Sequence, residues 1–538
     1  MGDNMKTKMR VIAILLTWCF ILAIIRLLVI ISDKKYSQVS TAQSFATVEV
    51  AESRGTIYDR NKKSLTNATQ YYRAAVVSSP QAIACLSELL NDTAFSNLTK
   101  TLRSGKPAVV SCGGYFSAVG AYVHRYYSYY SEKNVLAAHM LGYLDSEGNG
   151  VCGIEKSFNS LLKAKEALKV SFCLDARGNA LAGVDPIVTG EDAYSVTQGV
   201  VTTLDSKIQS IVEEESSKFL KKGAVVVLDV GSGEICASAS FPTYEVTNVA
   251  ASLTLEDSPF INRALTAYNV GSVFKLCVAA AALEHSVTAQ EKFYCNGFIE
   301  IDRTRYYCNN RKGHGRLDME EALCKSCNCY FIQLAQKIGA KAVFNMTQSM
   351  GFGKKQELCE GLCGSGGTIP RLEDLLQESG ALVNLSFGQG VLMATPLQVT
   401  AMTAAIANGG LYTAPSLIQA TMNTKGELTP YATKKTTRIM SVKTAALLRQ
   451  MMVSVVERGT GSKAACHDVA VGGKTATAET GWYIDGRAIN QAWFTGFASQ
   501  ELPQYAITIL AEDGVSGASS AAPLFSSIVS RMKAEGIL

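Results

Sequence analysis

The chain has 538 residues, of which 47% are hydrophobic and 18% are charged, and its formal net charge at pH 7 is +5. This length suffices for two or three domains with hydrophobic cores of their own. Because the net charge is small and no dense run of lysine and arginine occurs, the composition gives no reason to expect a nucleic-acid-binding protein.

The first segment predicts a membrane anchor. Residues 11–31 are almost entirely apolar, and about 20 helical residues span the hydrocarbon core of a bilayer. A cleaved signal peptide is the alternative, but the apolar stretch is too long for one. Three basic side chains precede it, so residues 1–10 are expected in the cytoplasm and the remainder outside. These are Lys6, Lys8 and Arg10.

Residues 34–47 are polar and predict a short stalk, and residues 51–199 mix short strands and helices without strong periodicity. Residues 201–538 differ from them. Helical spacing over residues 205–222 opens this second part. Five strands are predicted in it, at residues 224–230, 234–241, 469–478, 491–498 and 505–512. Mostly helical segments separate the first two strands from the last three, and a helix over residues 521–533 follows. This order predicts an α+β domain with one antiparallel five-stranded sheet flanked by helices.

Ser272 and Lys275 stand at the start of an alanine-rich, nearly all-apolar helix over residues 273–283. Residues three apart on a helix are neighbours, and burial lowers the pKa of a lysine toward the range where it acts as a base. Lys275 is therefore the candidate to take the proton of a nucleophilic Ser272. The alternative is that Ser272 only caps the helix.

Ser326 and Asn328 lie between two helical stretches. Either could be no more than the N-cap of the helix that starts near Tyr330. The functional interpretation makes Ser326 a relay that carries a proton between Lys275 and a leaving amine. Asn328 would then hold an amide of the substrate.

Lys474 and Thr475 follow two glycines on a predicted strand. A phosphate-binding loop would need a glycine where Asp468 stands, and a helix afterwards, so that interpretation is rejected. An edge strand can instead dock an extended peptide, with Lys474 and Thr475 meeting its carboxylate. The three short patterns together predict an acyl-transfer site.

Fifteen cysteines are present, and three of them, Cys324, Cys327 and Cys329, surround the second pattern. A zinc site would need a suitably spaced histidine, and only His314 is near. We therefore expect no metal and no other cofactor. Oxidising surroundings would pair the thiols, whereas reducing ones would leave them packed as small hydrophobic residues.

The chain resembles the class B penicillin-binding proteins, single-pass membrane transpeptidases of bacterial cell-wall synthesis. Beyond the three short patterns, further segments match this family. They are residues 54–60, 153–156, 223–229, 262–265, 388–390, 395–398 and 492–497. The resemblance implies an elongated pedestal or dimerisation domain over residues 32–200 and a penicillin-recognising transpeptidase domain over residues 201–538.

The resemblance also implies the chemistry. Ser272, activated by Lys275, would attack the D-alanyl-D-alanine bond of a peptidoglycan stem peptide and release D-alanine. An amine on a neighbouring strand would take the acyl group, and β-lactams would acylate the same serine. Backbone N–H groups of Ser272 and Thr477 would form the oxyanion hole, with Thr477 also binding substrate. A polytopic glycan polymerase in the membrane is the expected partner.

Ala476 departs from the family pattern, which has glycine after the lysine and threonine. A methyl group there adds bulk beside the substrate, so slower β-lactam acylation is expected. The alternatives to a transpeptidase are a D-alanine carboxypeptidase or β-lactamase-like hydrolase, and a catalytically weakened scaffold or sensor.

Overall fold

The computed structural model describes residues 2–32, 45–130, 135–163, 166–175, 177–181, 183–191, 196–432, 434–484, 486–499 and 502–538. The chain divides into two compact units. The smaller unit comprises Met1–Arg54, Thr69–Ser128 and Ala164–Ser195, and the larger unit comprises Gly55–Ala68, Tyr129–Lys163 and Val196–Leu538.

The larger unit includes two segments, residues 55–68 and 129–163, that the sequence assigned to the pedestal. The first segment belongs to the larger unit because its strand β2 (Thr56–Tyr58) pairs in parallel with β8 (Gly199–Thr202). A pairing between strands so distant in sequence leaves no trace in local patterns. The domain boundary at residue 200 stays a prediction.

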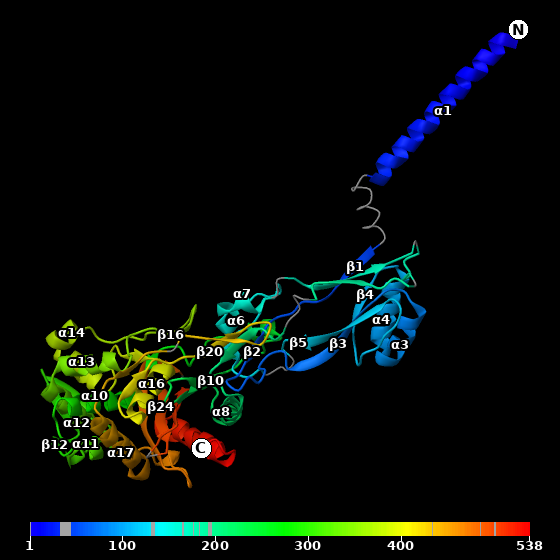
Figure 1. Cartoon of the computed structure of the whole chain (residues 1–538). Coiled ribbons are helices and arrows are strands. Elements are labelled where there is room, and N and C mark those ends of the chain that lie inside the picture. The colour runs from blue at the N-terminus through cyan, green and yellow to red at the C-terminus, as the bar shows by residue number, and fades with distance from the viewer. Residues whose placement is uncertain are drawn as a thin grey trace. The chain divides into compact units, whose positions relative to one another are not determined.

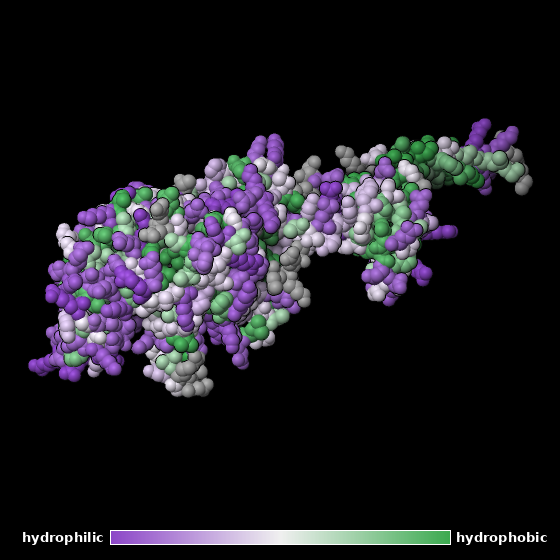
Figure 2. All heavy atoms as spheres, turned by 90° about the horizontal axis from the view of Figure 1, so that it is seen from below, coloured by the Kyte–Doolittle hydropathy of each residue, from purple (hydrophilic) through white to green (hydrophobic). Residues whose placement is uncertain are grey.

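The predicted anchor lies within helix α1 (Gly2–Ser32). Within the described ranges, Asn4–Ser32 is the one helix long and apolar enough to cross a membrane, and none of its apolar window is buried. Figure 2 shows hydrophobic side chains along most of this helix and hydrophilic ones near one end. A membrane anchor is consistent with these features, while the direction of crossing stays a prediction.

The remainder of the smaller unit contains two antiparallel sheets. One has the order β4-β3-β5, and the apolar faces of helices α3 and α4 share a core with it. The other has the order β1-β6-β7. The bounds are β1 Phe45–Ala51, β3 Thr69–Val76, α3 Pro80–Leu89, α4 Asp92–Arg103, β4 Ala108–Cys112, β5 Ala121–Ser128, β6 Leu168–Cys173 and β7 Ile187–Thr189.

The main sheet of the larger unit confirms the predicted antiparallel five-stranded fold, with the order β10-β9-β25-β24-β23. Figure 1 labels two of its strands, β10 and β24. The strands are β9 Gly223–Asp229, β10 Ile235–Phe241, β23 Val471–Ile484, β24 Arg487–Ala498 and β25 Tyr505–Glu512. β23 and β24 form a longer hairpin than predicted. β23 is an edge strand, so its free side is available to an extended ligand.

Alternating side chains of the sheet face two separate cores. On one face, Val225 and Val227 pack with residues of α8 (Ser206–Phe219) and α18 (Ala522–Ala534). On the other face, Val226 and Leu228 join a large core with α10 (Lys275–Glu284) and α16 (Pro396–Ala407). Helices therefore flank both faces of the sheet, as predicted.

Further helices and strands complete the larger unit. The remaining helices are α5 Ala138–Leu141, α6 Gly153–Ser157, α7 Asn159–Leu162, α9 Val249–Ser252, η1 Gly271–Phe274, α11 Met319–Cys324, α12 Asn328–Ile338, α13 Ala340–Ser349, α14 Leu372–Gln377, α15 Ser379–Ser386, α17 Val442–Arg458, η2 Ser462–Ala464 and η3 Gly517–Ala521. The remaining strands are β11 Tyr268–Asn269, β12 Phe293–Cys295, β13 Phe298–Ile301, β14 Thr304–Tyr307, β15 Gly315–Leu317, β16 Gln356–Cys359, β17 Leu362–Gly364, β18 Met393–Ala394, β19 Leu411–Thr413, β20 Ile418–Met422, β21 Leu428–Pro430 and β22 Thr436–Arg438.

Candidate active site

Ser272 lies in the short 3-10 turn η1, which continues directly into α10. Its neighbours Val273 and Phe274 are fully buried, whereas Ser272 is only half-buried and lines a cavity of about 730 Å³. The sequence predicted a regular helix here and missed the tighter first turn. That turn places the hydroxyl at the cavity wall and the following apolar side chains in the core.

Two glycines fix the position of this turn. Gly271 has a φ of +63°, in the left-handed region that favours glycine, and its N–H donates to the carbonyl oxygen of Gly388 at 2.8 Å. A Cβ on Gly388 would lie 2.0 Å from the carbonyl oxygen of Gly271. The family-like segment at residues 388–390 therefore acts by close backbone approach to the serine turn.

Lys275 lies beneath the cavity with no exposed surface. Its Nζ donates to the carbonyl oxygen of Ser326 at 2.7 Å, to the Oδ1 of Asn328 at 2.7 Å and to the Oγ of Ser326 at 3.3 Å. Burial lowers the pKa of Lys275 to about 8, which brings the neutral amine within reach near neutral pH. The structure thus brings the first and second sequence patterns together.

Lys474 joins the same group from strand β23. Its Nζ is fully buried and donates to the Oγ of Ser326 at 3.1 Å and to the carbonyl oxygen of Thr475 at 2.9 Å. Burial, and then the charge of Lys275, hold the pKa of Lys474 well below its usual range. Lys275, Ser326, Asn328 and Lys474 form what we call the polar cluster, in which Ser326 Oγ accepts from both lysines.

The cavity collects the remaining predicted residues. Ser272, Ser326, Asn328, Thr475 and Thr477 all line it, while the two lysines lie below its floor. All seven predicted site residues are therefore brought together. Sequence reasoning missed other lining residues, including Tyr307, Asn309, Arg311, Asn384, Gln389, Thr460 and Glu479.

The second pattern differs from its prediction in one respect. The N-cap of α12 is neither Ser326 nor Asn328 but Cys327, whose sulfur accepts from the N–H of Tyr330 at 3.5 Å. Ser326 has a φ of +52°, an unusual backbone conformation for a residue other than glycine. The turn therefore holds a strained residue at the centre of the polar cluster.

A buried network holds the segment before Ser272 against the sheet. Arg263 Nε donates to Glu512 Oε1 of β25 at 2.9 Å, and the hydroxyl of Tyr268 donates to the same oxygen at 2.6 Å. Trp493 Nε1 of β24 donates to the carbonyl oxygen of Asn269 at 2.9 Å. The resemblance contained Arg263 and Trp493 within its matching segments, but their positioning role is visible only in the structure.

The structure also brings His314 together with three cysteines. The ligand atoms of Cys295, Cys308, His314 and Cys327 all lie within 4.8 Å of one another, and we call these four residues the thiol cluster. The sequence argument against a metal depended on the lack of a suitably spaced histidine. That argument fails, because folding supplies the histidine from a loop. All fifteen cysteines lie in the described ranges, and each is a free thiol there.

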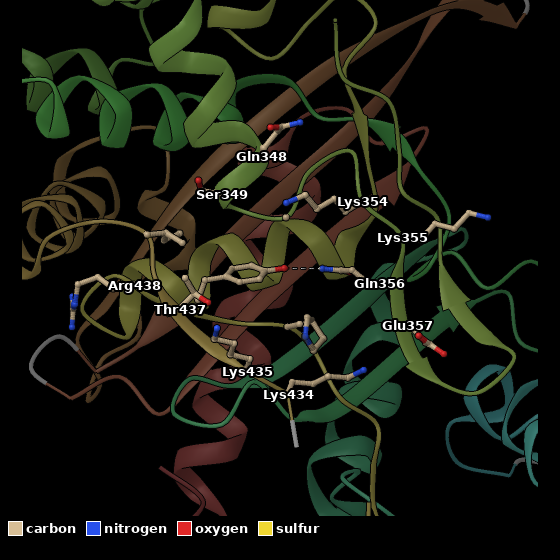
Figure 3. A pocket seen from close by; sticks show the side chains of 15 residues that line it. Gln348, Ser349, Lys354, Lys355, Gln356, Glu357, Lys434, Lys435, Thr437 and Arg438 are labelled. Atoms are coloured by element: carbon tan, nitrogen blue, oxygen red, sulfur yellow. Dashed lines mark hydrogen bonds between the residues drawn. The ribbon is translucent and has the colours of Figure 1, made fainter. Parts of the chain in front are cut away.

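A second cavity, of about 640 Å³, opens elsewhere on the larger unit (Figure 3). Its lining is strongly basic, with Lys354, Lys355, Lys434, Lys435 and Arg438. The described residues that line it include none of the seven predicted site residues. It is therefore separate from the acyl-transfer site.

Comparison with known proteins agrees with this geometry. The family model described as "Penicillin binding protein transpeptidase domain" matches residues 223–530, more than half of the chain. The chain belongs to the class B penicillin-binding proteins. Its match to stage V sporulation protein D of Bacillus subtilis is 30% identical over 417 residues, covering 73% of this chain and 62% of that protein.

Two further relatives extend the likeness. Peptidoglycan D,D-transpeptidase MrdA of Acinetobacter baumannii is 26% identical over 583 residues, which cover 93% of this chain and 84% of that protein. The crystal structure of penicillin-binding protein 3 from Mycobacterium tuberculosis, complexed with aztreonam, superposes with a TM-score of 0.66 at 25% identity, covering 91% of this chain and 97% of that one. The likeness thus extends over nearly the whole chain.

Proposed function

We propose that the chain is a peptidoglycan D,D-transpeptidase that cross-links stem peptides through an acyl-enzyme on Ser272. The observation that carries this proposal is the polar cluster, a buried lysine pair around Ser326 directly below a serine at a cavity wall. A related chain bears the name peptidoglycan D,D-transpeptidase, which supports the same assignment.

The proposed first step uses Lys275 as the base. Its pKa of about 8 leaves a fraction of neutral amine at physiological pH, which takes the proton of Ser272 as the oxygen attacks the carbonyl of the D-alanyl-D-alanine bond. The hydrogen bonds of Lys275 Nζ described above do not involve Ser272; nucleophile–base hydrogen bonds often tighten only when substrate is bound.

The other predicted residues would relay the proton, stabilise the oxyanion and bind the substrate. Ser326 Oγ, between the two lysine Nζ atoms, carries the proton to the departing D-alanine amine. Backbone N–H groups of Ser272 and Thr477 would bind the oxyanion, and Asn328 would hold a substrate amide. Thr475 would meet the substrate carboxylate, while Lys474, being fully buried, would act through its charge and through Ser326.

A transpeptidase passes the acyl group to an amine, whereas the alternative, a hydrolase such as a D-alanine carboxypeptidase, passes it to water. The edge strand β23 and a cavity of about 730 Å³ leave room for a second peptide whose amine takes the acyl group. β-Lactams would acylate Ser272 as substrate mimics. The aztreonam complex of the mycobacterial relative supports this.

Location and partner follow from α1. We propose that this helix anchors the chain in the cell membrane with its N-terminus in the cytoplasm and its catalytic unit outside. The basic residues before the apolar stretch support that direction. A polytopic glycan polymerase is the proposed partner, since cross-linking needs nascent glycan strands close to the membrane.

The test combines two assays on the full-length chain. Fluorescent penicillin should label the wild type and leave Ser272→Ala unlabelled, which separates an enzyme from a scaffold. Co-incubation with a glycan polymerase and lipid-linked precursor should then yield cross-linked dimers. Release of D-alanine without dimers would replace the transpeptidase by a hydrolase.

A further inference from the structure

The thiol cluster lies next to the polar cluster and has no part in the proposed acyl transfer. Cys295, Cys308 and Cys327 have exposed fractions of 1%, 2% and 0%, and His314 is half-buried. Three different segments supply the four residues: the end of β12, the loop between β14 and β15, and the turn before α12. Folding thus gathers four metal-ligand side chains at one point.

Three of the six ligand-atom distances within the thiol cluster match tetrahedral coordination closely, and all six are within 4.8 Å. The sulfurs of Cys308 and Cys327 are 3.7 Å apart, and His314 Nδ1 lies 3.5 Å from the sulfur of Cys308 and 3.7 Å from that of Cys295. With Zn–S bonds of about 2.3 Å and Zn–N bonds of about 2.0–2.1 Å, a tetrahedron places two sulfurs about 3.8 Å apart and a sulfur and nitrogen about 3.6 Å apart. A disulfide would need sulfurs about 2.05 Å apart.

We propose that Cys295, Cys308, His314 and Cys327 bind one zinc ion. Three sulfurs and one imidazole nitrogen are a typical ligand set for a structural zinc site. Four protein ligands fill the tetrahedron, so the ion has no open position for water or substrate and serves to hold the protein together.

The fold holds the sulfur of Cys327 in a defined place. This sulfur caps the 11-residue helix α12 by accepting from the N–H of Tyr330 at 3.5 Å. When zinc binds, the three thiols release their protons, and the ion with three thiolates and one neutral imidazole carries a net charge of about −1.

The position of the site gives the ion a further role, which rests on the proposed function. Cys327 lies between Ser326 and Asn328, the two residues to which Lys275 donates. Ser326 has the left-handed φ of +52°, so the turn needs restraint from its neighbours. A zinc bond at Cys327 fixes this turn to β12 and to the loop before β15, and zinc is thereby a positioning element for the polar cluster.

The binding test needs no enzymatic activity. The full-length chain is purified in detergent under reducing conditions, equilibrated with zinc, freed of excess metal and analysed for zinc and protein. We expect one zinc per chain. The double variant Cys308→Ser/His314→Ala should retain less than about one-tenth of that, since two of four ligands are lost.

A matched control and a second readout keep the result decisive. Cys236→Ser changes a buried thiol outside the thiol cluster and should keep one zinc per chain. Cobalt(II) loaded into the wild type should show thiolate-to-cobalt charge-transfer absorption and the intense visible bands of a tetrahedral ion, a readout that does not depend on the folding of any variant. Wild-type protein without zinc or such a spectrum, or with a Cys308–Cys327 disulfide, would overturn the proposal.

Discussion

The polar cluster and the thiol cluster meet at three consecutive residues, Ser326, Cys327 and Asn328, yet they differ in almost every physical respect. The polar cluster consists of amines, a hydroxyl and an amide below a cavity about 730 Å³ in volume. The thiol cluster consists of three buried sulfurs and an imidazole, whose ligand atoms lie within 4.8 Å of one another. We propose that the first group moves protons and that the second holds a turn in place.

This difference indicates how the strained turn at Ser326 can be held in the conformation that catalysis needs. Ser326 must keep its left-handed backbone while its hydroxyl stays between two lysines. The two lysines contact Ser326 through hydrogen bonds alone. The proposed zinc bond at Cys327 would restrain the backbone of the adjacent residue directly. Loss of the polar cluster should therefore abolish chemistry and spare the fold, whereas loss of the thiol cluster should weaken both.

The largest effect is expected from Lys275→Met, which removes the proposed base and keeps the buried volume. The rate of acylation by penicillin should fall by about 10²–10⁴-fold, the usual contribution of a general base. Stopped-flow acylation kinetics measure this, with the melting temperature as the test of fold. Lys443→Met, at an exposed position, is the control. An unchanged rate in Lys275→Met would remove Lys275 from the mechanism.

A smaller effect should follow removal of the metal from the wild type. A strong chelator should lower the melting temperature and slow acylation by about 10–100-fold, as loss of supporting metal-site interactions commonly does. Added zinc should restore the melting temperature and the acylation rate of the wild type. It should not restore the acylation rate of Lys275→Met, which lacks the proposed base. If chelation changed the melting temperature but not the acylation rate, the zinc would be structural without positioning the polar cluster.

The smallest effect concerns Ala476, which lines the cavity and is 3% exposed. Its methyl group lies close to the serine turn, since a Cβ on Gly271 would be 3.4 Å from it. Ala476→Gly should speed acylation about fivefold, the factor that corresponds to ~1 kcal/mol, the low end of the cost of one extra methylene in a packed site.

The control for this small effect is Ala478→Gly, the next inward-facing position on β23, which is fully buried and does not line the cavity. It should lose about 0.5–1 kcal/mol of stability, as strand glycines do, without faster acylation. Equal rates in Ala476→Gly and the wild type would mean that the methyl group does not hinder the ligand.

Much of this architecture could be predicted from sequence because its signals are local. Two apolar runs on either side of the turn at residues 231–233 predicted β9 and β10 to within about a residue, and β25 was predicted equally closely. Short spacings paired Ser272 with Lys275 and Ser326 with Asn328, whereas the known combination of the three patterns predicted that Lys474 joins them. Ser272 and Lys275 are one helical turn apart, so their neighbourhood follows from helix geometry alone.

The thiol cluster could not be predicted, for a physical reason. Its four ligands lie on three segments whose approach depends on how β12, β14 and β15 fold against α12. The tight η1 turn was also missed, since it depends on the contact between Gly271 and the distant Gly388. Pairing of β2 with β8 is the third case of the same kind. Each depends on tertiary contacts that no local pattern contains.

The central claim is that Ser272 forms the covalent acyl-enzyme, and intact-protein mass spectrometry tests it most directly. After incubation with a penicillin, the folded wild-type chain should gain the mass of one whole β-lactam, because ring opening leaves the entire molecule on the serine. Peptide mapping should place that mass on Ser272, and Ser272→Ala should gain none. A wild-type chain of unchanged mass, or an adduct on another residue, would contradict the account.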